Sequence, residues 1–500
     1  IRRQRQMCIR DSLQSEDISK VVSELRNGRL SVEPNTKEHV AQYDPKLHDI
    51  NDTQKRPDKL VVIDKDSDEY GEVKNVNPNV EQTTEQGFRI EPVARIALAI
   101  QKLIVKRAVA FTFGNPVTYG SNPEGEDEKA LLKAINRAFH DVKEKTLNRR
   151  IARSLYSMTE VAELWYPVEV PEHETYGFKT TKKFKVAIFS PMFGDRLYPY
   201  FDDTRDMVAF SRQFTRKDRD MITRTYFETY TKDKHYLWCC DGLDGEVAGK
   251  NWTLVEGFPK ELTIGKIPVI YACQPQVEWE DVQSLIDRLE KLLSNFADTN
   301  DYHASPKIFV QGKVIGFAWK GEAGAIIEGE NGATAQYLAW QNAPESVKLE
   351  IETLLRMIYT ITQTPDISFD TVKGIGAISG VALQLLFMDA HLKVQDKSEI
   401  FSDYLQRRVN VLKAFFKQAH LEWSKACDNL IIEPEIVPYI IEDELSKINI
   451  LTSANGNKQI ASRRATIQRL GWADNVDEEE KAIINEEDRE NSYYQNEPTI

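Results

Sequence analysis

Two amphipathic helices are predicted from the spacing of apolar residues in the middle of the chain. They cover residues 277–304 and 344–361, and a proline lies at the first turn of the second, a position that prolines favour. At about 1.5 Å per residue, the first would be a rod about 40 Å long. Their apolar positions are Val282, Leu285, Ile286, Leu289, Leu292, Leu293 and Phe296 in the first and Val347, Ile351, Leu354, Leu355, Ile358 and Ile361 in the second. Each helix has one apolar face, so each needs a partner to cover it.

A third helical pattern is much longer than the helices of ordinary globular proteins. It runs over residues 380–427 and would extend for about 72 Å if straight, so we expect it to be kinked or to be part of an assembly. Residues 362–379, with one proline and two glycines, are predicted to form a loop before it. Two further helical stretches are predicted nearer the start of the chain, at residues 91–111 and 126–166.

Between these groups of helices the pattern changes to short runs of aromatic and β-branched residues, separated by turn residues. Runs of this kind are typical of an antiparallel meander of strands. Further strand-like runs lie in the glycine-rich stretch 306–342, so the chain as a whole is predicted to be an α+β protein. The runs of the meander are residues 182–191, 196–201, 207–217, 223–238 and 252–258.

Both ends of the chain are polar. From Leu13 to about Gln86 the sequence is poor in helix signals and is interrupted by four prolines, so we expect an extended arm. Near the other end, a short helix is predicted at residues 462–470, and an acidic stretch follows at residues 474–490.

Composition and charge narrow the class of protein. With 500 residues, 41% hydrophobic and 29% charged, the chain is too long for one core and suggests about two to four structural units. The most apolar stretch is broken by Lys102, Lys106 and Arg107, and no run reaches the roughly 18 apolar residues of a membrane span. The net charge of −13 argues against non-specific DNA binding by the whole surface. Five cysteines, of which Cys239 and Cys240 are adjacent, make no disulfide framework, so we expect an intracellular chain.

The first twelve residues are expected to be foreign to the gene. Residues 2–11 can be back-translated as CGT CGG CAG CGT CAG ATG TGT ATA AGA GAC, a string that resembles a transposase sequencing adapter. Such segments are set aside before a fold is inferred. Because this one carries four arginines and one aspartate, the rest of the chain is more acidic than the whole.

No catalytic constellation is found in the sequence. The motifs GxxxxGK[ST], HExxH and GxSxG are absent, and the eight histidines are scattered singly. His303 lies near Asp298 and Asp301 at a predicted helix end, where we expect a cap or a surface role rather than a metal site. The acidic run 478–480 is expected to be solvated, since consecutive residues of a helix do not face one another. The sequence therefore predicts no enzyme, no cofactor and no metal site.

Four passages resemble the portal proteins of tailed bacteriophages, in the family with long-tailed members that infect Gram-positive hosts. Residues 266–312 (KIPVI…SLID…ND…G) are similar to one passage of that family, and residues 364–406 (TPD…SGVAL) to the passage that leads into its long helix. Residues 459–487, with DEEE near their end, are similar to its C-terminal segment, and residues 224–238 resemble its wing strands more weakly. The order and spacing of these passages carry the resemblance, while the N-terminal arm departs from the family.

The resemblance implies an α+β portal fold with a wing, paired stem helices, a small β-rich clip, a tunnel loop, a long kinked helix and a C-terminal crown. The implied divisions, after the adapter at 1–12, are the N-terminal arm and wing at 13–276, a stem helix at 277–304, the clip at 305–343, a stem helix at 344–361, the tunnel loop at 362–379, the long wing helix at 380–427, and the crown with the acidic C-terminus at 428–500.

The resemblance also implies a function and a set of partners. Portal subunits form a homo-oligomeric ring, usually a dodecamer, at one capsid vertex, and double-stranded DNA is packaged and ejected through it. The implied partners are the terminase large subunit, a head-completion or adaptor protein, and the major capsid and scaffold proteins, with no membrane. The chain would assemble in the host cytoplasm and reside in the virion. Two alternatives remain open: a DNA-processing enzyme such as a nuclease, and another minor head protein of the virion.

One basic residue is expected to contact DNA from the loop. Lys373 is the only basic residue of residues 362–379, and it is flanked by Gly374 and Gly376. The alternative is an ordinary exposed loop lysine. A mostly acidic body with a few positive side chains at the constriction would keep phosphate contacts weak enough for DNA to slide.

Two further pairs of residues are weaker candidates. Lys393 and Lys397, in the long helical pattern, could face DNA, and the alternative is a solvated helix face. Trp319 and Trp340, in the glycine-rich insertion, could anchor subunit contacts or dock the packaging motor, because aromatic residues are enriched at binding hot spots. The alternative for both tryptophans is a place in the local core.

Overall fold

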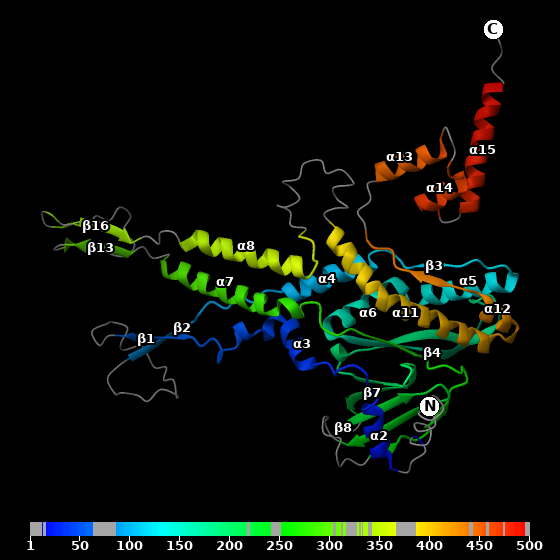
Figure 1. Ribbon diagram of the computed structural model, residues 1–500, viewed down its shortest axis with the longest axis horizontal. Coiled ribbons are helices and arrows are strands. Elements are labelled where there is room, and N and C mark those ends of the chain that lie inside the picture. Colours follow the sequence, from blue (N-terminus) through cyan, green and yellow to red (C-terminus); the bar gives the residue numbers. More distant parts are fainter. Residues whose placement is uncertain are drawn as a thin grey trace, which may run out of the picture. The chain divides into compact units, whose positions relative to one another are not determined.

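The chain folds into two compact units, and Figure 1 shows the helices and strands of which they consist. The first comprises Ile1–Thr364 and Ala390–Pro438, and the second comprises Pro365–Asp389 and Tyr439–Ile500. The residues that this computed structural model describes are 13, 17–63, 87–217, 221–241, 252–303, 307–311, 314–316, 328–329, 332, 334–338, 343–366, 387–439, 444–456, 460–473 and 476–495.

The core of the first unit is a three-stranded antiparallel sheet, in the order β12-β4-β5, with helices packed on it. Helices α6 and α11 lie side by side above β4 in Figure 1, and Tyr156 of α6 meets Phe401 of α11 with ring centroids 6.1 Å apart. Phe184 of β5 packs on Phe415 of α11 at 5.4 Å. The elements are α4 (Ile100–Phe113), α5 (Glu126–Asp141), α6 (Glu144–Met158), β4 (Glu160–His173), β5 (Thr180–Phe189), β12 (Val269–Cys273) and α11 (Met388–Ala419).

The helical stretch predicted at residues 126–166 is wrong in its details. It contains two helices and the start of a strand, because the backbone takes left-handed conformations at Lys143, with φ 54°, and at Thr159, with φ 63°. The apolar run after Thr159 joins the central sheet, where Val161 and Trp165 are fully buried. A short apolar run has the same composition in a buried helix and in a buried strand, and the sheet partners decide between them.

The helix predicted at residues 91–111 begins nine residues later than expected, at Ile100. The residues before it are extended and run along helix α7 (Gln283–His303), whose side chains take the place of a neighbouring strand. The backbone N–H groups of three alternate residues donate to that helix. These bonds are Ala94 to Asp298 at 2.7 Å, Ile96 to Ser294 at 2.9 Å and Leu98 to Glu290 at 2.7 Å. Tertiary hydrogen bonds therefore override the local helical pattern.

The predicted antiparallel meander is confirmed for residues 196–258, whereas the predicted run 182–191 forms β5 of the central sheet instead. Its strands follow the order β10-β9-β8-β7-β6, and β11 pairs with β9. Aromatic residues alternate into its two faces, so that Phe227 belongs to one buried cluster and Phe210 to another. The strands are β6 (Arg196–Phe201), β7 (Met207–Lys217), β8 (Thr223–Tyr230), β9 (Lys234–Asp241), β10 (Thr253–Leu254) and β11 (Lys260–Glu261).

The extended arm predicted for residues 13–86 is wrong for residues 17–63, which are the main part of it that the structure describes. These residues belong to the first unit and hold helices and a strand, and the first helix buries Val21, Val22 and Leu25 against the meander. Asp17 and Asn35 cap the two helices with their side chains, Pro34 and Pro57 lie between elements, and Pro45 begins a 3₁₀ turn. The elements are α2 (Ile18–Arg26), α3 (Thr36–Tyr43), the 3₁₀ turns Pro45–Leu47 and Asp49–Asn51, and β1 (Lys59–Ile63), which pairs with β2 (Gly87–Glu91).

The two amphipathic helices of the middle region are confirmed. The first is α7, preceded by a 3₁₀ turn at Glu280–Val282, and the second is α8 (Ala343–Ile361). They pack on each other, as Figure 1 shows, and Arg288 of α7 donates to Glu350 of α8 at 2.7 Å. Between them lie two antiparallel strand pairs. These are β13 (Lys307–Gln311) with β16 (Thr334–Leu338), and β14 (Val314–Gly316) with β15 (Glu328–Gly329).

The third helical pattern is interrupted near its end. Helix α11 has 32 residues and stops at Ala419, because His420 takes an extended conformation with φ −139° and ψ 96°. A 3₁₀ turn at Leu421–Trp423 and the short helix α12 (Ser424–Asn429) follow. The His420 ring stacks on Phe178 at 4.8 Å, a contact that fixes the break. Residues 380–386 of the predicted helix lie outside the described residues.

The second unit contains three helices in its described part. The predicted short helix at 462–470 is confirmed as α14, with Ser462 as its N-cap and Gly471 in the left-handed conformation after it, φ 76°. Arg463 bonds Glu487 at 2.7 Å and joins α14 to α15, which carries the acidic stretch. No helix in the described ranges combines the length and the apolar character needed to cross a bilayer. The helices are α13 (Glu444–Asn455), α14 (Arg463–Leu470) and α15 (Val476–Gln495).

Candidate functional site

Only two of the site residues expected from the sequence fall within the described residues. Lys393 and Lys397 lie near the start of α11. The loop candidates Lys373, Gly374 and Gly376 and the two insertion tryptophans, Trp319 and Trp340, lie outside the described residues.

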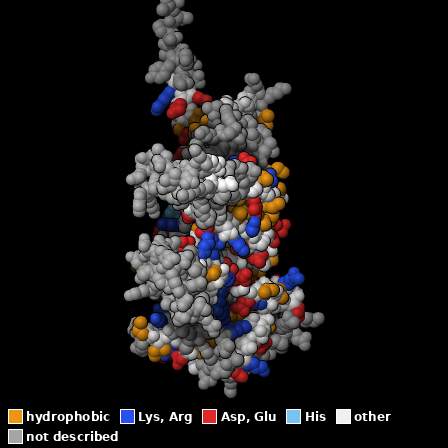
Figure 2. All heavy atoms as spheres, turned by 90° about the vertical axis from the view of Figure 1, so that its left-hand side faces the viewer, with side chains coloured by type: hydrophobic (Ala, Val, Ile, Leu, Met, Phe, Trp, Pro, Cys, Tyr) orange, Lys and Arg blue, Asp and Glu red, His pale blue; other side chains and the backbone are white. Residues whose placement is uncertain are grey.

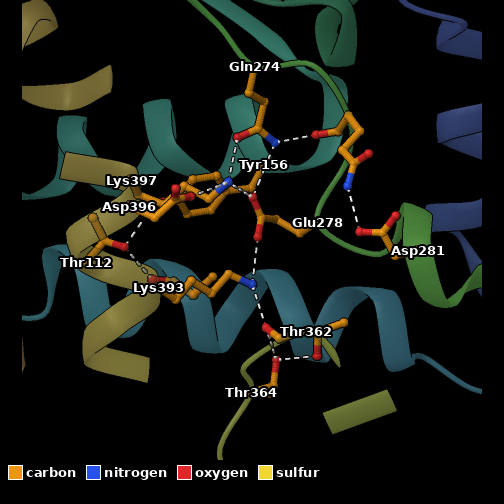
Figure 3. Close-up of polar contacts among 12 residues, drawn as sticks. Thr112, Tyr156, Gln274, Glu278, Asp281, Thr362, Thr364, Lys393, Asp396 and Lys397 are labelled. Carbon is orange, nitrogen blue, oxygen red and sulfur yellow. Dashed lines mark hydrogen bonds and ion pairs between the residues drawn. The ribbon is translucent and has the colours of Figure 1, made fainter. Parts of the chain in front are cut away.

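The alternative interpretation, in which Lys393 and Lys397 lie on a solvated helix face, is wrong because both side chains are largely buried. They are four residues apart, so their side chains leave the same face of α11, and both reach the carboxylate of Glu278 (Figure 3). The Nζ–O distances are 2.6 Å from Lys393 to Oε2 and 2.8 Å from Lys397 to Oε1. The side chains of Lys393 and Glu278 are only 10% and 4% exposed. In the protomer, neither ammonium group is presented to solvent as a ligand site.

Lys393 also closes the end of helix α8. Its Nζ donates to the backbone carbonyl of Thr362 at 2.9 Å, just beyond the last helical residue (Figure 3). The hydroxyl of Thr362 donates to the Ile358 carbonyl at 2.7 Å, and its oxygen lies 2.9 Å from the Thr364 hydroxyl. Carbonyl groups at a helix C-terminus lack partners within the helix and carry partial negative charge, so an ammonium group stabilises them.

Lys397 makes a different set of contacts, all on the opposite side of Glu278. Its Nζ donates to Gln274 Oε1 at 3.3 Å and lies 5.6 Å from the centroid of the Tyr156 ring. Gln274 in turn donates to Glu278 at 3.3 Å. The Tyr156 hydroxyl meets Thr112 of α4 at 3.0 Å. These groups tie the start of α11 to α6 and to the chain that follows β12.

The electrostatics of this cluster are dominated by two cations on one buried anion. Burial alone would raise the pKa of Glu278, but Lys393 and Lys397 outweigh it and hold the pKa below its usual value. Burial lowers the pKa of Lys393, and the Glu278 carboxylate offsets only part of that effect. Burial raises the pKa of the Tyr156 hydroxyl. Asp396 lies 4.0 Å from Lys397, but its side chain is largely exposed.

The arrangement holds chain segments together rather than presenting reactive groups. Glu278 precedes α7, Thr362 follows α8 and the lysines begin α11, so one cluster joins the ends of three helices. In the described part of the chain, no group of three or more His, Cys, Asp and Glu side chains is placed to hold a metal ion. Asp298, considered above as part of a ligand cluster, instead pairs with Arg56 at 2.9 Å.

Helix α8 exposes apolar side chains in addition to its packed face. Leu354 and Ile358 are buried, whereas Leu349 and Met357 are 65% and 48% exposed, and Ile361 is exposed as well. The expectation of a single apolar face on this helix is therefore incomplete. Figure 2 shows that hydrophobic, basic and acidic side chains reach the molecular surface in small groups on the face it presents. An exposed apolar strip on an amphipathic helix is a typical contact surface for another protein chain.

Sequence reasoning missed Glu278, Gln274 and Thr362, which no local motif distinguishes. A signal for the burial of the two lysines was nevertheless present. Positions 393, 397, 401, 404 and 408 form one stripe of α11 at helical spacing, and Phe401, Tyr404 and Arg408 on it are fully buried. Lysines that continue an apolar stripe are expected to lie inside and to find a carboxylate there.

Comparison with known proteins identifies the family. The profile described as "Phage portal protein, SPP1 Gp6-like" matches residues 63–493, so the N-terminal helices α2 and α3 precede the matched range. No curated protein sequence matches the chain. Similar solved structures include chains from the "Neck of empty GTA particle computed with C6 symmetry" and the "Neck of native GTA particle computed with C12 symmetry". Each is 11% identical and the match covers 74% of this chain and 89% of the other, with TM-scores of 0.40 and 0.39, values that carry no conclusion about assembly. The match of the profile to most of its length shows that this chain belongs to the SPP1 Gp6-like family of phage portal proteins.

Proposed function

We propose that this portal protein assembles as a ring, a dodecamer in the particle, at one vertex of a phage capsid. Double-stranded DNA would pass through the ring during packaging and ejection. The observation that carries the proposal is the family match over residues 63–493. The family is structural rather than catalytic, and the cluster around Glu278 joins helices without presenting a nucleophile.

The exposed apolar strip of α8 supports assembly into a ring. Leu349, Met357 and Ile361 are exposed in the protomer, although side chains of this kind gain roughly 1.5–3 kcal/mol each when fully buried. A heterologous contact between neighbouring copies would bury them, and such contacts close into rings when the rotation between copies permits. The paired helices α7 and α8 would then be the stem of each subunit.

The remaining parts of the chain receive their proposed roles from the family. The strands between α7 and α8 would form the clip, with Trp319 and Trp340 as candidates for docking the terminase large subunit. Residues 362–379 would form the tunnel loop, with Lys373 touching DNA phosphates beside Gly374 and Gly376. A head-completion protein, the major capsid protein and scaffold would be the other partners, in a long-tailed virion assembled in the cytoplasm of a Gram-positive host.

Negative-stain electron microscopy of the purified chain without residues 1–12 tests the proposal. Rings with a central channel wide enough for a DNA duplex are the expected result. A chain that stays monomeric, even with capsid and scaffold proteins present, would contradict it. Divalent-metal-dependent cleavage of DNA by such monomers would favour a nuclease instead.

A further inference from the structure

The side chain of Lys393 connects two helix ends that are far apart in the sequence. Its ammonium group lies 2.6 Å from the Glu278 carboxylate, just before α7, and 2.9 Å from the Thr362 carbonyl, just after α8. We propose that Lys393 is a positioning residue that holds the end of α8 against the start of α11, so that it sets the direction in which the chain leaves α8.

The first support is the chemistry of the Thr362 end. The Thr362 carbonyl lies beyond the last helical residue of α8 and accepts a short bond from Lys393 Nζ, at 2.9 Å, and a longer one from the Thr364 hydroxyl, at 3.4 Å. Around it, the amide of Thr362 donates to Ile358 at 3.1 Å and that of Thr364 to Tyr359 at 2.9 Å. The last turn of α8 therefore continues through Thr364 as an ordered, hydrogen-bonded stretch, and the ammonium group closes it.

The second support is burial. Thr362 and Thr364 are buried together with Lys393 and Glu278, so water does not compete for these hydrogen bonds. A charged hydrogen bond in a low-dielectric site is stronger and more sharply oriented than one at the surface. Lysine has a flexible stem, and Glu278 fixes where its ammonium group lies.

Lys397 provides a matched control within the same cluster. It pairs with the other oxygen of Glu278, at 2.8 Å, but its remaining contacts are with Gln274 and Tyr156 rather than with α8. Removing either lysine leaves one ammonium group on one carboxylate. The two variants therefore lose a comparable ion pair, and only the loss of Lys393 removes the charged donor to Thr362, which leaves the longer bond from the Thr364 hydroxyl.

The first experiment is hydrogen exchange on purified Lys393→Met and Lys397→Met proteins. Lys393→Met is expected to speed exchange of the amides of residues 362–364 by about tenfold or more, and Lys397→Met by less than about threefold. Amides of β8 report global opening and serve as the internal reference. Equal acceleration in the two variants, or none in Lys393→Met, would overturn the inference. If Lys393→Met does not fold, Lys393→Gln, which lacks the charge, takes its place in the same comparison.

The consequence for DNA depends on the proposed function, in which residues 362–379 form the tunnel loop. Particles assembled with the Lys393→Met portal are expected to hold at least about fivefold less DNA than those with Lys397→Met, at equal portal content per particle. Equal DNA content together with unequal exchange would reject the assignment of the tunnel loop, whereas equal exchange in the two variants would overturn the positioning role. Failure of the unmodified chain to form rings would reject the proposed function alone, because the exchange comparison is made on the protein itself.

Discussion

Arg408 shows what a single buried charge contributes to this fold. Its side chain is fully buried in α11, and it grips the Glu163 carboxylate of β4 with two hydrogen bonds, at 2.7 and 2.8 Å. A third bond, at 2.6 Å, reaches Asn148 of α6. Burial alone would lower the pKa of Arg408, but the Glu163 carboxylate outweighs it and raises the pKa. One guanidinium group thus joins a helix, a strand and a second helix, a geometry that lysine cannot reproduce.

Replacing this arginine is expected to be costly. In Arg408→Met, Glu163 is left in the core without a counter-ion and with the Trp165 indole as a neutral hydrogen-bond donor, so the free energy of unfolding should fall by about 3–5 kcal/mol. Chemical denaturation measures the change. Lys417→Met is the control, because Lys417 makes an ion pair with Asp428 at the surface and its loss should change stability by less than about 1 kcal/mol. Equal losses in the free energy of unfolding for the two variants would contradict the larger contribution expected of the buried ion pair.

At the scale of elements, the N-terminal helix α2 and the residues that follow it are held on the meander and on β4 by close backbone approach and by arginines. Arg26 lies 5.4 Å over the Tyr198 ring, and Arg29 pairs with Glu160 at 2.8 Å. Gly28, between them, lies so close to Tyr200 that a Cβ atom built on it would be 1.9 Å from the ring. The segment that precedes the family match is therefore closely fitted to the meander rather than loosely attached.

Gly28→Ala should loosen α2 selectively. The added methyl group collides with a buried aromatic ring, so we expect a loss of about 1–3 kcal/mol in the free energy of unfolding. Limited proteolysis between α2 and α3 should become faster in parallel. Gly120→Ala, where a Cβ atom would be 3.7 Å from the nearest atom, is the control and should change stability by no more than about 0.5 kcal/mol. Resistance to proteolysis equal to that of the unmodified protein would contradict the expected fit.

The turn after α3 docks on α7 through a buried histidine. His48 Nδ1 lies 2.7 Å from Glu290 and Nε2 lies 2.7 Å from the Gln42 carbonyl, so both ring nitrogens face acceptors. Only the imidazolium form donates from both. Burial by itself would lower the pKa of His48, but the bond to Glu290 outweighs it and raises the pKa above the usual 6.5. Asp287 of α7 adds to the negative field around the ring.

The sign of the pH effect follows from the raised pKa. The protonated ring stabilises the fold fully below about pH 6.5, and this contribution is lost as the pH rises through the higher pKa of the folded state. Thermal unfolding of the unmodified protein and of His48→Gln should therefore differ most near pH 6, and the difference should shrink towards pH 9, by up to about 1.4 kcal/mol per pH unit. If the difference in stability between the two proteins grows with pH, His48 is not protonated in the folded protein.

An element of the fold can be predicted from the sequence when the apolar periodicity of its own residues defines it. Helices α7 and α8 and the meander were predicted because apolar periodicity is a local property. The extended stretch before α4 was not, since its hydrogen bonds go to side chains of α7 about 200 residues away, such as Asp298. Glu278 was missed for the same reason, as its partners Lys393 and Lys397 come from a distant helix. Residues that join elements are recognised only when the elements are placed in space.

For the whole molecule, the exposed strip of α8 predicts which substitutions separate folding from assembly. Leu349 is 65% exposed, so Leu349→Glu should leave the thermal unfolding of the protomer within about 0.5 kcal/mol of the unmodified protein. In a ring, the same substitution would bury an unpaired carboxylate at every interface, and each such charge costs several kcal/mol. Because a closed ring repeats the contact in every subunit, the loss applies at each interface and rings should disappear.

Sedimentation velocity and negative-stain microscopy measure that loss directly, on protein at one concentration. Leu254→Glu is the matched control, since Leu254 is also an exposed leucine but lies on β10 of the meander, away from α7 and α8. Its rings should persist. If Leu349→Glu forms rings as readily as the unmodified chain, the α8 strip does not lie between subunits. If Leu254→Glu alone abolishes them, the meander provides the contact instead, and the paired helices serve some other purpose than assembly.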